Sequence, residues 1–282
     1  MNKIQKRRLS ALKKELLLVE RAEKKMEQAA LKAKSAIWKT ELESRIPRKV
    51  YQGLESAFCK GFGLIFDQGL SIIEKGYSKT DIQADYDIRD YAVQRKGGRK
   101  ELKQLRNGAR QSNLQNMIVT TLEGIGLGML GVGMPDIVLF LGTLLKGVYE
   151  TALSYGAEYE SRQAQMLILK MMETALQTGE RWVEENSEVD AMLRFETVDI
   201  TEEQLNQQVK ATASAFAMDM LLLKFIQGLP VVGIIGGAAN PVYYNKVMNY
   251  VQLKYRKRYL QIRRESDVNN SFREDLEKEG TI

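Results

Sequence analysis

The chain of 282 residues contains no histidine and a single cysteine, Cys59. Without histidine it can form neither a Ser-His-Asp triad nor a Cys-His pair, and it cannot build the Cys/His clusters that bind zinc. A single cysteine also excludes a disulfide within the chain. We interpret Cys59 as a small core residue of a helix, because nothing near it indicates an activated thiolate. We therefore expect a protein that is not an enzyme and that needs no cofactor or metal.

The sequence also lacks any alternating run rich in Val, Ile and Thr that is long enough to predict a strand. Apolar residues instead recur at helical spacing, and hydrophobic residues make up 44% of the chain, enough to form a core. We predict an all-α fold: a multi-helix globular bundle with two apolar helical segments punctuated by glycine and proline, and a long basic N-terminal helix.

Local patterns place the helices. Two pairs have the spacing of a capping box at a helix start, Thr80 with Gln83 and Thr201 with Gln204. Asn240 and Pro241 suit the N-cap and the first position of the last helix. Elsewhere in the chain we expect helices over 4–45, 48–77 and 157–186, and a polar loop over 187–199.

Positive charge is concentrated near the two ends of the chain. Residues 1–34 contain eleven basic and four acidic residues, and residues 246–264 contain seven basic residues and no acid. A third basic cluster lies within 95–110, whereas 265–282 is acidic. Basic clusters attract phosphate, which nucleic acid and anionic lipid headgroups both supply; a solvated helix face is the simpler alternative. The candidate basic surface consists of Lys254, Arg256, Lys257, Arg258, Arg263 and Arg264.

Residues 4–45 have the pattern of one long helix that Pro47 ends. Apolar residues fit heptad positions a and d, with Glu23 as the one charged interruption. Because alanines and Glu23 weaken this seam, we favour an arm that packs on the body over a coiled coil with a partner or a second copy. The heptad positions are Leu9, Leu12, Leu16, Val19, Met26, Ala30, Ala33 and Ile37.

Two apolar segments, 124–135 and 225–241, are interrupted by glycine and proline. Glycine among large aliphatic residues permits either close helix contacts in a core or a bendable apolar hairpin. The candidate structural residues at and after these segments are Pro135, Asp136, Gly236, Gly237, Asn240 and Pro241. The candidate apolar surface consists of Ile125, Leu127, Met129, Leu130, Val132, Val231, Val232, Ile234 and Ile235.

Neither segment predicts a simple transmembrane helix. The charge-free stretch 124–135 falls short of the roughly 20 residues that span a bilayer, and the prolines and glycines of 225–245 oppose a straight helix. Three charged residues would be costly at membrane depth, namely Glu123, Asp136 and Lys146. Gly126, Gly128 and Gly131 match a dinucleotide-binding pattern, but the chain shows no strand-helix alternation to support it.

Three motifs resemble the EcsC protein family over roughly residues 45–264. They are Gly-Val-Gly-Met-Pro-Asp-Ile at 131–137, Tyr155-Gly156, and Leu-Pro-Val-Val-Gly-Ile-Ile-Gly-Gly-Ala-Ala-Asn at 229–240; Tyr255-Arg256 with Arg258 also fits. The resemblance implies a bacterial, all-helical protein, often cytoplasmic, in a membrane setting. It supplies no catalytic residues.

The favoured function is peripheral membrane association, in which the glycine-rich apolar segments and the basic helices bind an anionic lipid surface or a membrane protein. A membrane-permeabilising effector is a special case of this function. The alternative from another class is a soluble interaction or self-association module whose glycine-rich segments are the core. Nucleic acid is the less favoured source of phosphate. An oxygen-only magnesium or calcium enzyme is the remaining alternative, with Asp136, Glu123, Asp219 and Glu158 as its candidates.

We expect three parts: a basic helical arm over 1–46, the EcsC-like helical domain over 47–264, and an acidic flexible tail over 265–282. The apolar run Leu16–Val19 is too short for a secretion signal, and no lipidation motif is present. We therefore expect a cytoplasmic protein that acts at the inner face of the cell membrane, with self-association through the N-terminal helix as an option.

Overall fold

The computed structural model describes residues 3–34, 46–66, 73–115, 134–194, 199–226 and 239–278. This part of the chain contains helices and no strand, which confirms the all-α prediction. The helices are α1 (Lys3–Lys34), α3 (Arg48–Leu64), α5 (Lys79–Lys96), α6 (Arg99–Gln115), α7 (Met134–Ser154), α8 (Arg162–Leu176), α9 (Glu180–Arg194), α10 (Glu202–Ile226) and α11 (Ala239–Lys278).

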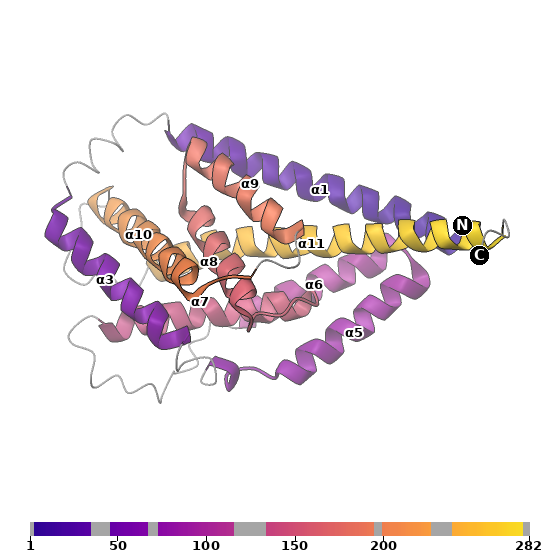
Figure 1. Ribbon diagram of the computed structural model, residues 1–282, viewed down its shortest axis with the longest axis horizontal. Helices are drawn as coiled ribbons and strands as arrows, with labels where there is room; N and C mark the ends of the chain where they lie inside the picture. Colours follow the sequence, from indigo (N-terminus) through magenta and orange to yellow (C-terminus); the bar gives the residue numbers. More distant parts are fainter. Residues whose placement is uncertain are drawn as a thin grey trace.

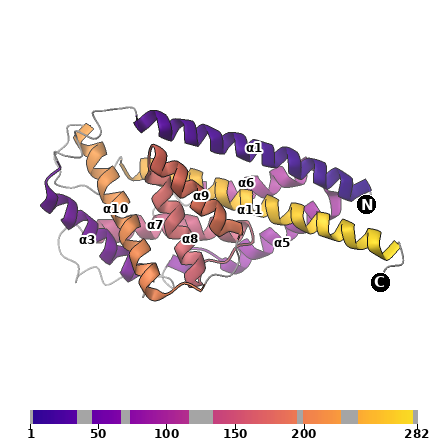
Figure 2. The same cartoon turned by 45° about the horizontal axis from the view of Figure 1, so that its top comes forward.

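The longest helix, α11, runs through the middle of an elongated bundle (Figure 1). Along its length α1 lies on one side and α5 and α6 on the other, while α3 and α10 close one end of the molecule (Figures 1 and 2). The N-terminal end of α1 and the C-terminal end of α11 lie together at the opposite end (Figure 2). The first and last helices of the described residues therefore pack against each other.

Helix α7 forms the centre of the core. It packs against α3, α5, α6 and α11, and Leu141, Leu144 and Val148 are completely buried. Among the described helices, Ile137–Ser154 alone is long and apolar enough to cross a membrane, but 89% of it is buried inside the protein. Its apolar character therefore reflects packing on all sides by other helices.

One of the two predicted capping boxes is confirmed and the other is not. Thr201 and Gln204 bond reciprocally at the start of α10, with the Thr201 N–H donating to Gln204 Oε1 at 2.9 Å and the Gln204 N–H donating to Thr201 Oγ1 at 3.2 Å. At α5 the prediction of Thr80 was wrong, because the helix begins two residues earlier than a Thr80 cap would allow. Ser78 is the N-cap and accepts the Asp81 N–H at 3.2 Å.

The segment 157–194 differs from the expected helix and loop. Helix α8 ends at Leu176, and Gly179 takes a left-handed conformation (φ 70°) before α9 begins. Much of the predicted polar loop 187–199 is helical, because α9 continues to Arg194. The polar composition of 187–194 indicated a loop, but the helix has an inward face on which Val189 is completely buried.

Helix α11 begins at Ala239, which places Asn240 and Pro241 in its first turn instead of at the N-cap and first position. Proline is tolerated there because a first-turn N–H has no partner within the helix. The helix then continues to Lys278, through most of the segment predicted to be a flexible tail. Asp267 in this extension is buried and pairs with Arg8 of α1.

Candidate functional site

Helix α1 packs as an arm along α11 of the same chain (Figure 1). Its inward positions follow the predicted heptad, since Leu12 and Val19 are completely buried and Leu16 is nearly so. The heptad positions that could have formed a coiled coil are therefore buried against the rest of the protein. What remains available to a partner is the opposite, outward face of α1.

A closed group of four charges lies where α1, α9 and α11 meet. Lys254 of α11 is completely buried; it donates to Asp190 of α9 at 2.6 Å and to Glu23 of α1. Lys257 donates to the second oxygens of the same two carboxylates, at 2.6 Å to Glu23 and 2.7 Å to Asp190. Two ammonium groups thus face two carboxylates, and the interruption of the α1 heptad by Glu23 supplies the countercharge for buried lysines.

Burial and ion pairing have opposite effects within this group. Burial lowers the pKa of Lys254 because it penalises the charged ammonium, although Glu23 and Asp190 oppose that shift. For Asp190 burial acts to raise the pKa, but the two lysines outweigh it and the pKa is lowered. Ion pairing therefore outweighs the effect of burial on the pKa of Asp190 and opposes it at Lys254.

The second acid on the inward side of α1, Glu15, is almost completely buried and faces three arginines. Arg99 of α6 donates to Glu15 Oε1 from Nε at 3.2 Å and from Nη2 at 3.1 Å. Arg106 Nη1 lies 3.6 Å from Glu15 Oε2, and Arg256 of α11 donates to that same oxygen. Here one carboxylate serves three guanidinium groups.

Asp90 and Asp267 take part in further polar contacts between α11 and its neighbours. Asp90 of α5 accepts the Tyr259 hydroxyl at 2.7 Å and also pairs with Arg263. Arg8 of α1 pairs with Asp267 through both carboxylate oxygens. Acids of α1, α5 and α9 thus neutralise most of the positive charge that α11 brings inside.

The structure therefore places four of the six residues of the predicted basic surface inside the molecule. Lys254 and Lys257 are buried, and Arg256 and Arg263 are largely buried in ion pairs. Arg258 is half-buried, and Arg264 is exposed. The absence of acids within 246–264 indicated a surface, but the neutralising carboxylates come from distant parts of the chain: Glu23 is 231 residues from Lys254.

The outward face of α1 is an exposed basic surface on the helix that the sequence identified as basic, and its residues were not among those of the predicted basic surface. Its acids are segregated from its bases: Glu15 and Glu23 face inward and Glu27 is half-buried, which leaves Glu20 as the one exposed acid of the helix. Four large apolar side chains are exposed on the same helix, with Leu17 at 43% and Leu31 at 40%. The nine exposed bases are Lys3, Lys6, Arg7, Lys13, Lys14, Arg21, Lys24, Lys25 and Lys32.

The corner between α5 and α6 extends this surface. Gly97 (φ 59°) ends α5, and a Cβ at this position would lie 2.9 Å from the Arg8 Cβ and 3.0 Å from the Ile4 carbonyl oxygen. The corner therefore packs directly on the first turns of α1. It brings further exposed bases to that end of the molecule, namely Arg95, Lys96, Lys100 and Lys103.

The glycine-rich predictions lie mainly outside the described residues. Pro135 and Asp136 are in the first turn of α7, which begins at Met134. Outside the described residues are Ile125, Leu127, Met129, Leu130, Val132, Val231, Val232, Ile234, Ile235, Gly236 and Gly237.

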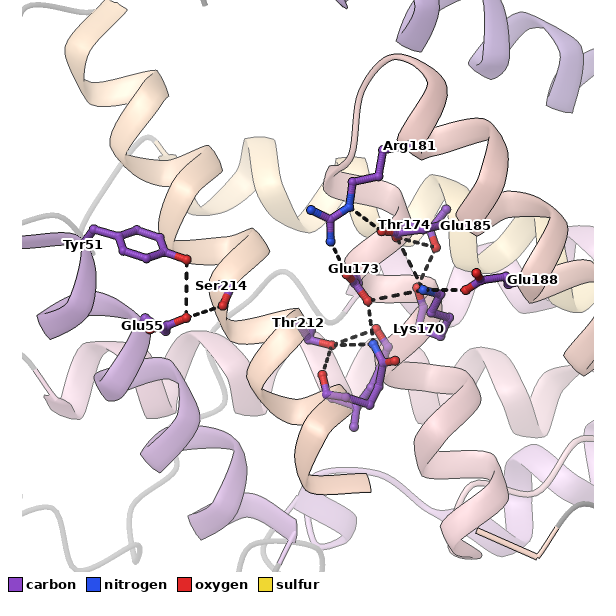
Figure 3. A network of polar contacts seen from close by, with 12 residues as sticks. Tyr51, Glu55, Lys170, Glu173, Thr174, Arg181, Glu185, Glu188, Thr212 and Ser214 are labelled. Atoms are coloured by element: carbon purple, nitrogen blue, oxygen red, sulfur yellow. Dashed lines mark hydrogen bonds and ion pairs between the residues drawn. The ribbon is translucent and has the colours of Figure 1, made fainter. Parts of the chain in front are cut away.

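Polar contacts between α8, α9 and α10 form a separate network (Figure 3). Glu173 accepts Arg181 at 2.9 Å and Gln208 at 2.6 Å, and Arg181 also donates to Glu185 at 2.7 Å. Lys170 lies 2.8 Å from Glu188 (Figure 3). Glu173, Glu185 and Glu188 share the two bases Lys170 and Arg181, and Gln208 of α10 bonds to Glu173, so the contacts of this network join three helices.

The carboxylates considered for an oxygen-only metal site have other partners. Asp219 pairs with Lys246 at 2.9 Å, and Glu158 accepts the backbone N–H groups of Glu160 and Ser161 before α8. No group of three or more acidic or cysteine side chains suited to a metal occurs within the described residues. Asp136 and Glu123 are not described at the side-chain level.

A tyrosine cluster near the end of α7 surrounds a perturbed acid. Tyr77 donates to the Tyr159 hydroxyl at 2.8 Å, and Tyr159 donates to Glu74 at 2.5 Å. Burial raises the pKa of Glu150 to about 7, although Lys146 at 4.0 Å acts to lower it. Burial therefore brings the pKa of Glu150 close to neutral pH.

Comparison with known proteins assigns the chain to a family. No curated protein and no solved structure matches the chain. The model of the EcsC protein family matches residues 11–260, which includes most of α1 as well as the body that the sequence motifs indicated. The arm is therefore part of the family unit, and the chain belongs to the EcsC protein family.

Proposed function

We propose that this protein associates peripherally with anionic membranes and that the outward face of α1 is its lipid-binding surface. The observation that carries the proposal is the segregation of charge on α1, which exposes nine bases and one acid along a single helix. The complementary acids face inward, so they do not cancel this charge at the surface.

The exposed apolar side chains support a membrane over other phosphate-bearing partners. Leu17 lies one helical turn from Lys13, Lys14 and Arg21, so an apolar side chain is surrounded by long cationic ones. On a membrane, lysine and arginine stems can lie along the apolar boundary while their charged ends reach the headgroups, and leucine enters the acyl region. A nucleic acid backbone offers no comparable environment for leucine.

The expected affinity is moderate and depends on salt. Each cation near an anionic surface contributes on the order of 1 kcal/mol, so four of the nine would favour binding by about 4 kcal/mol, or roughly a thousandfold. This attraction is screened over about 10 Å at 0.1 M salt and about 3 Å at 1 M. Binding should therefore be reversible, and we place it at the anionic cytoplasmic leaflet.

The glycine-rich segments that contain Ile125 and Ile234 remain candidate apolar contacts on the evidence of the sequence alone. The proposal does not depend on them, because the α1 surface is complete without them. Permeabilisation of the membrane would require further parts of the protein, such as the buried helix α7, to leave the core.

The test is flotation of the full chain with liposomes of neutral phosphatidylcholine or of phosphatidylcholine with phosphatidylglycerol. A variant with Lys14→Gln, Arg21→Gln and Lys25→Gln removes three exposed charges from α1, and we expect it to lose about a hundredfold in affinity for the anionic liposomes. The matched control changes three exposed lysines on α3 and α10: Lys49→Gln, Lys60→Gln and Lys210→Gln.

The outcomes separate surface binding from a general effect of net charge. Anionic-dependent flotation that the α1 variant loses and the control variant keeps supports the proposal. Equal losses in the two variants would show that net charge alone drives binding, and the assignment to α1 would fail. Failure of the unmodified chain to float with anionic liposomes at low salt would overturn membrane association itself.

A further inference from the structure

The group around Glu15 has an excess of positive charge that its neighbour around Glu23 does not have. Around Glu23, two carboxylates balance two lysines. Around Glu15, a single carboxylate faces Arg99, Arg106 and Arg256, so these four groups, all within the described residues, together carry a charge of +2. Both groups lie on the inward side of α1, but α9 supplies a second carboxylate to the group around Glu23, whereas α6 supplies two arginines to the group around Glu15.

The three arginines also have more N–H donors than Glu15 can accept. Three guanidinium groups carry about fifteen N–H donors, whereas one carboxylate accepts about four hydrogen bonds. The Arg106 Nε–H is buried and has no hydrogen-bond partner among the described residues. Its Nη1 contact with Glu15 is long, at 3.6 Å, so Arg106 is held less firmly than Arg99.

The group is open on one side. The exposed fraction of the side chain rises from 14% for Arg256 to 25% for Arg106 and 56% for Arg99. Another cation lies nearby, because Arg256, Arg106 and Arg110 all act to lower the pKa of Tyr155 against the effect of burial, which raises it to about 12. An anion arriving from solvent would meet Arg99 and Arg106 first, with Arg256 behind them.

We propose that Arg99, Arg106 and Arg256 form a binding site for a phosphate monoester. A monoester carries a charge near −2 at neutral pH and offers three terminal oxygens, which match an excess of two charges and the forked donors of arginine. A phosphodiester carries a single negative charge and would leave the site unbalanced. Glu15 holds the three arginines in position while the site is empty.

The ligand chemistry has two sources, a soluble phosphate ester and the headgroup of phosphatidic acid, which is itself a monoester. The site does not require the proposed binding of membranes by α1, since a soluble ester would reach it in the absence of lipid. Phosphatidic acid is the source that would link this site to the proposed membrane association.

Calorimetric titration of the full chain with glycerol 3-phosphate tests the site in the absence of membranes. We expect saturable binding, and we expect Arg99→Gln with Arg106→Gln to weaken it at least about tenfold, since each removes a charge-assisted contact. The control is Lys60→Gln with Lys210→Gln, which should leave binding unchanged. Glu15→Gln should strengthen binding, because it raises the local charge to +3.

A second arm compares vesicles of phosphatidic acid with vesicles of phosphatidylglycerol adjusted to equal surface charge. A preference for phosphatidic acid that the arginine variant loses would identify the lipid headgroup as a source of the phosphate; glycerol 3-phosphate binding without that preference would identify a soluble ester.

The proposal is overturned if glycerol 3-phosphate does not bind saturably, or if the arginine and control variants lose affinity equally. Arg99 is more than half exposed, so Arg99→Gln alone remains a usable variant if the double variant or Glu15→Gln fails to fold. Binding of phosphatidylglycerol vesicles through α1 is expected to persist in the arginine variant, which keeps this result separate from the test of membrane association.

Discussion

The balance of charge around Glu23 makes a strong prediction for stability. In Glu23→Gln, the two ammonium groups of Lys254 and Lys257 are left with Asp190 as their single carboxylate among the four groups described. Lys254 is completely buried, so solvent cannot replace the lost charge. Removing one member of a buried ion pair costs about 3–5 kcal/mol, and we expect a loss of that size in the free energy of unfolding.

The sign of the pH dependence follows from Lys254. Its pKa is already below that of an exposed lysine, and loss of Glu23 removes the largest effect that opposes this shift. A lysine with a lowered folded pKa binds fewer protons in the folded state than in the unfolded state, so stability rises with pH through the window that ends near its unfolded pKa of about 10.4. The deficit of Glu23→Gln should therefore shrink between neutral pH and about pH 10.

Urea denaturation followed by circular dichroism measures both effects. With a slope of about 3 kcal/mol per molar, the midpoint of Glu23→Gln should fall by about 1 M or more. The companion variant Glu23→Leu with Lys254→Met removes one charge of each sign, leaves Lys257 paired with Asp190, and should recover to within about 1 kcal/mol of the unmodified chain. A Glu23→Gln deficit below about 1 kcal/mol, or no recovery in the companion, would refute the argument from charge balance.

Two other predictions concern α7 and the glycines. Burial raises the pKa of Glu150 to about 7, so its contribution to stability is complete below its unfolded pKa of about 4.5 and is lost as pH rises to 7. In Glu150→Gln this contribution is absent. The difference in unfolding free energy between pH 5 and pH 8, measured by denaturation, should therefore shrink by up to about 3 kcal/mol. Unchanged curves would contradict this assignment. Gly156→Ala should lower the melting temperature, since φ is 69° and its Cβ would lie 2.3 Å from the Tyr86 ring, whereas Gly53→Ala in open space within α3 should raise stability by about 0.5–1 kcal/mol; the opposite order would contradict the packing.

The features that could be predicted from sequence are those that depend on local spacing. The inward seam of α1, with Leu12 and Val19, follows from heptad periodicity, and the Thr201–Gln204 capping box joins residues three apart. The start of α5 was misplaced because Ser78 and Thr80 are both suitable N-cap residues, and the structure uses Ser78. Local patterns therefore gave the helical class and many helices, with errors at their boundaries.

The candidate site could not be predicted in the same way, because it depends on pairs that are distant in sequence. Glu15 and Arg256 are 241 residues apart, and nothing in the composition of 246–264 indicates that its charges are neutralised from α1. One signal was available: Glu15 and Glu23 lie eight residues apart on the apolar side of an otherwise amphipathic helix. Acids in such positions need buried cationic partners, and a segment with many bases and no acid, such as 246–264, is the natural source.

The most direct test of membrane contact by α1 uses an environment-sensitive fluorophore on a single introduced cysteine. With Cys59→Ser as background, the label is attached at Leu17→Cys on the outward face of α1 or, as control, at Ile88→Cys, which is 68% exposed on α5. We predict a blue shift on addition of anionic vesicles for the label at position 17, reversed by 1 M salt, and no shift at position 88. Binding of the labelled protein to vesicles without a shift at position 17, or with equal shifts at both positions, would contradict the assignment of the membrane surface to α1.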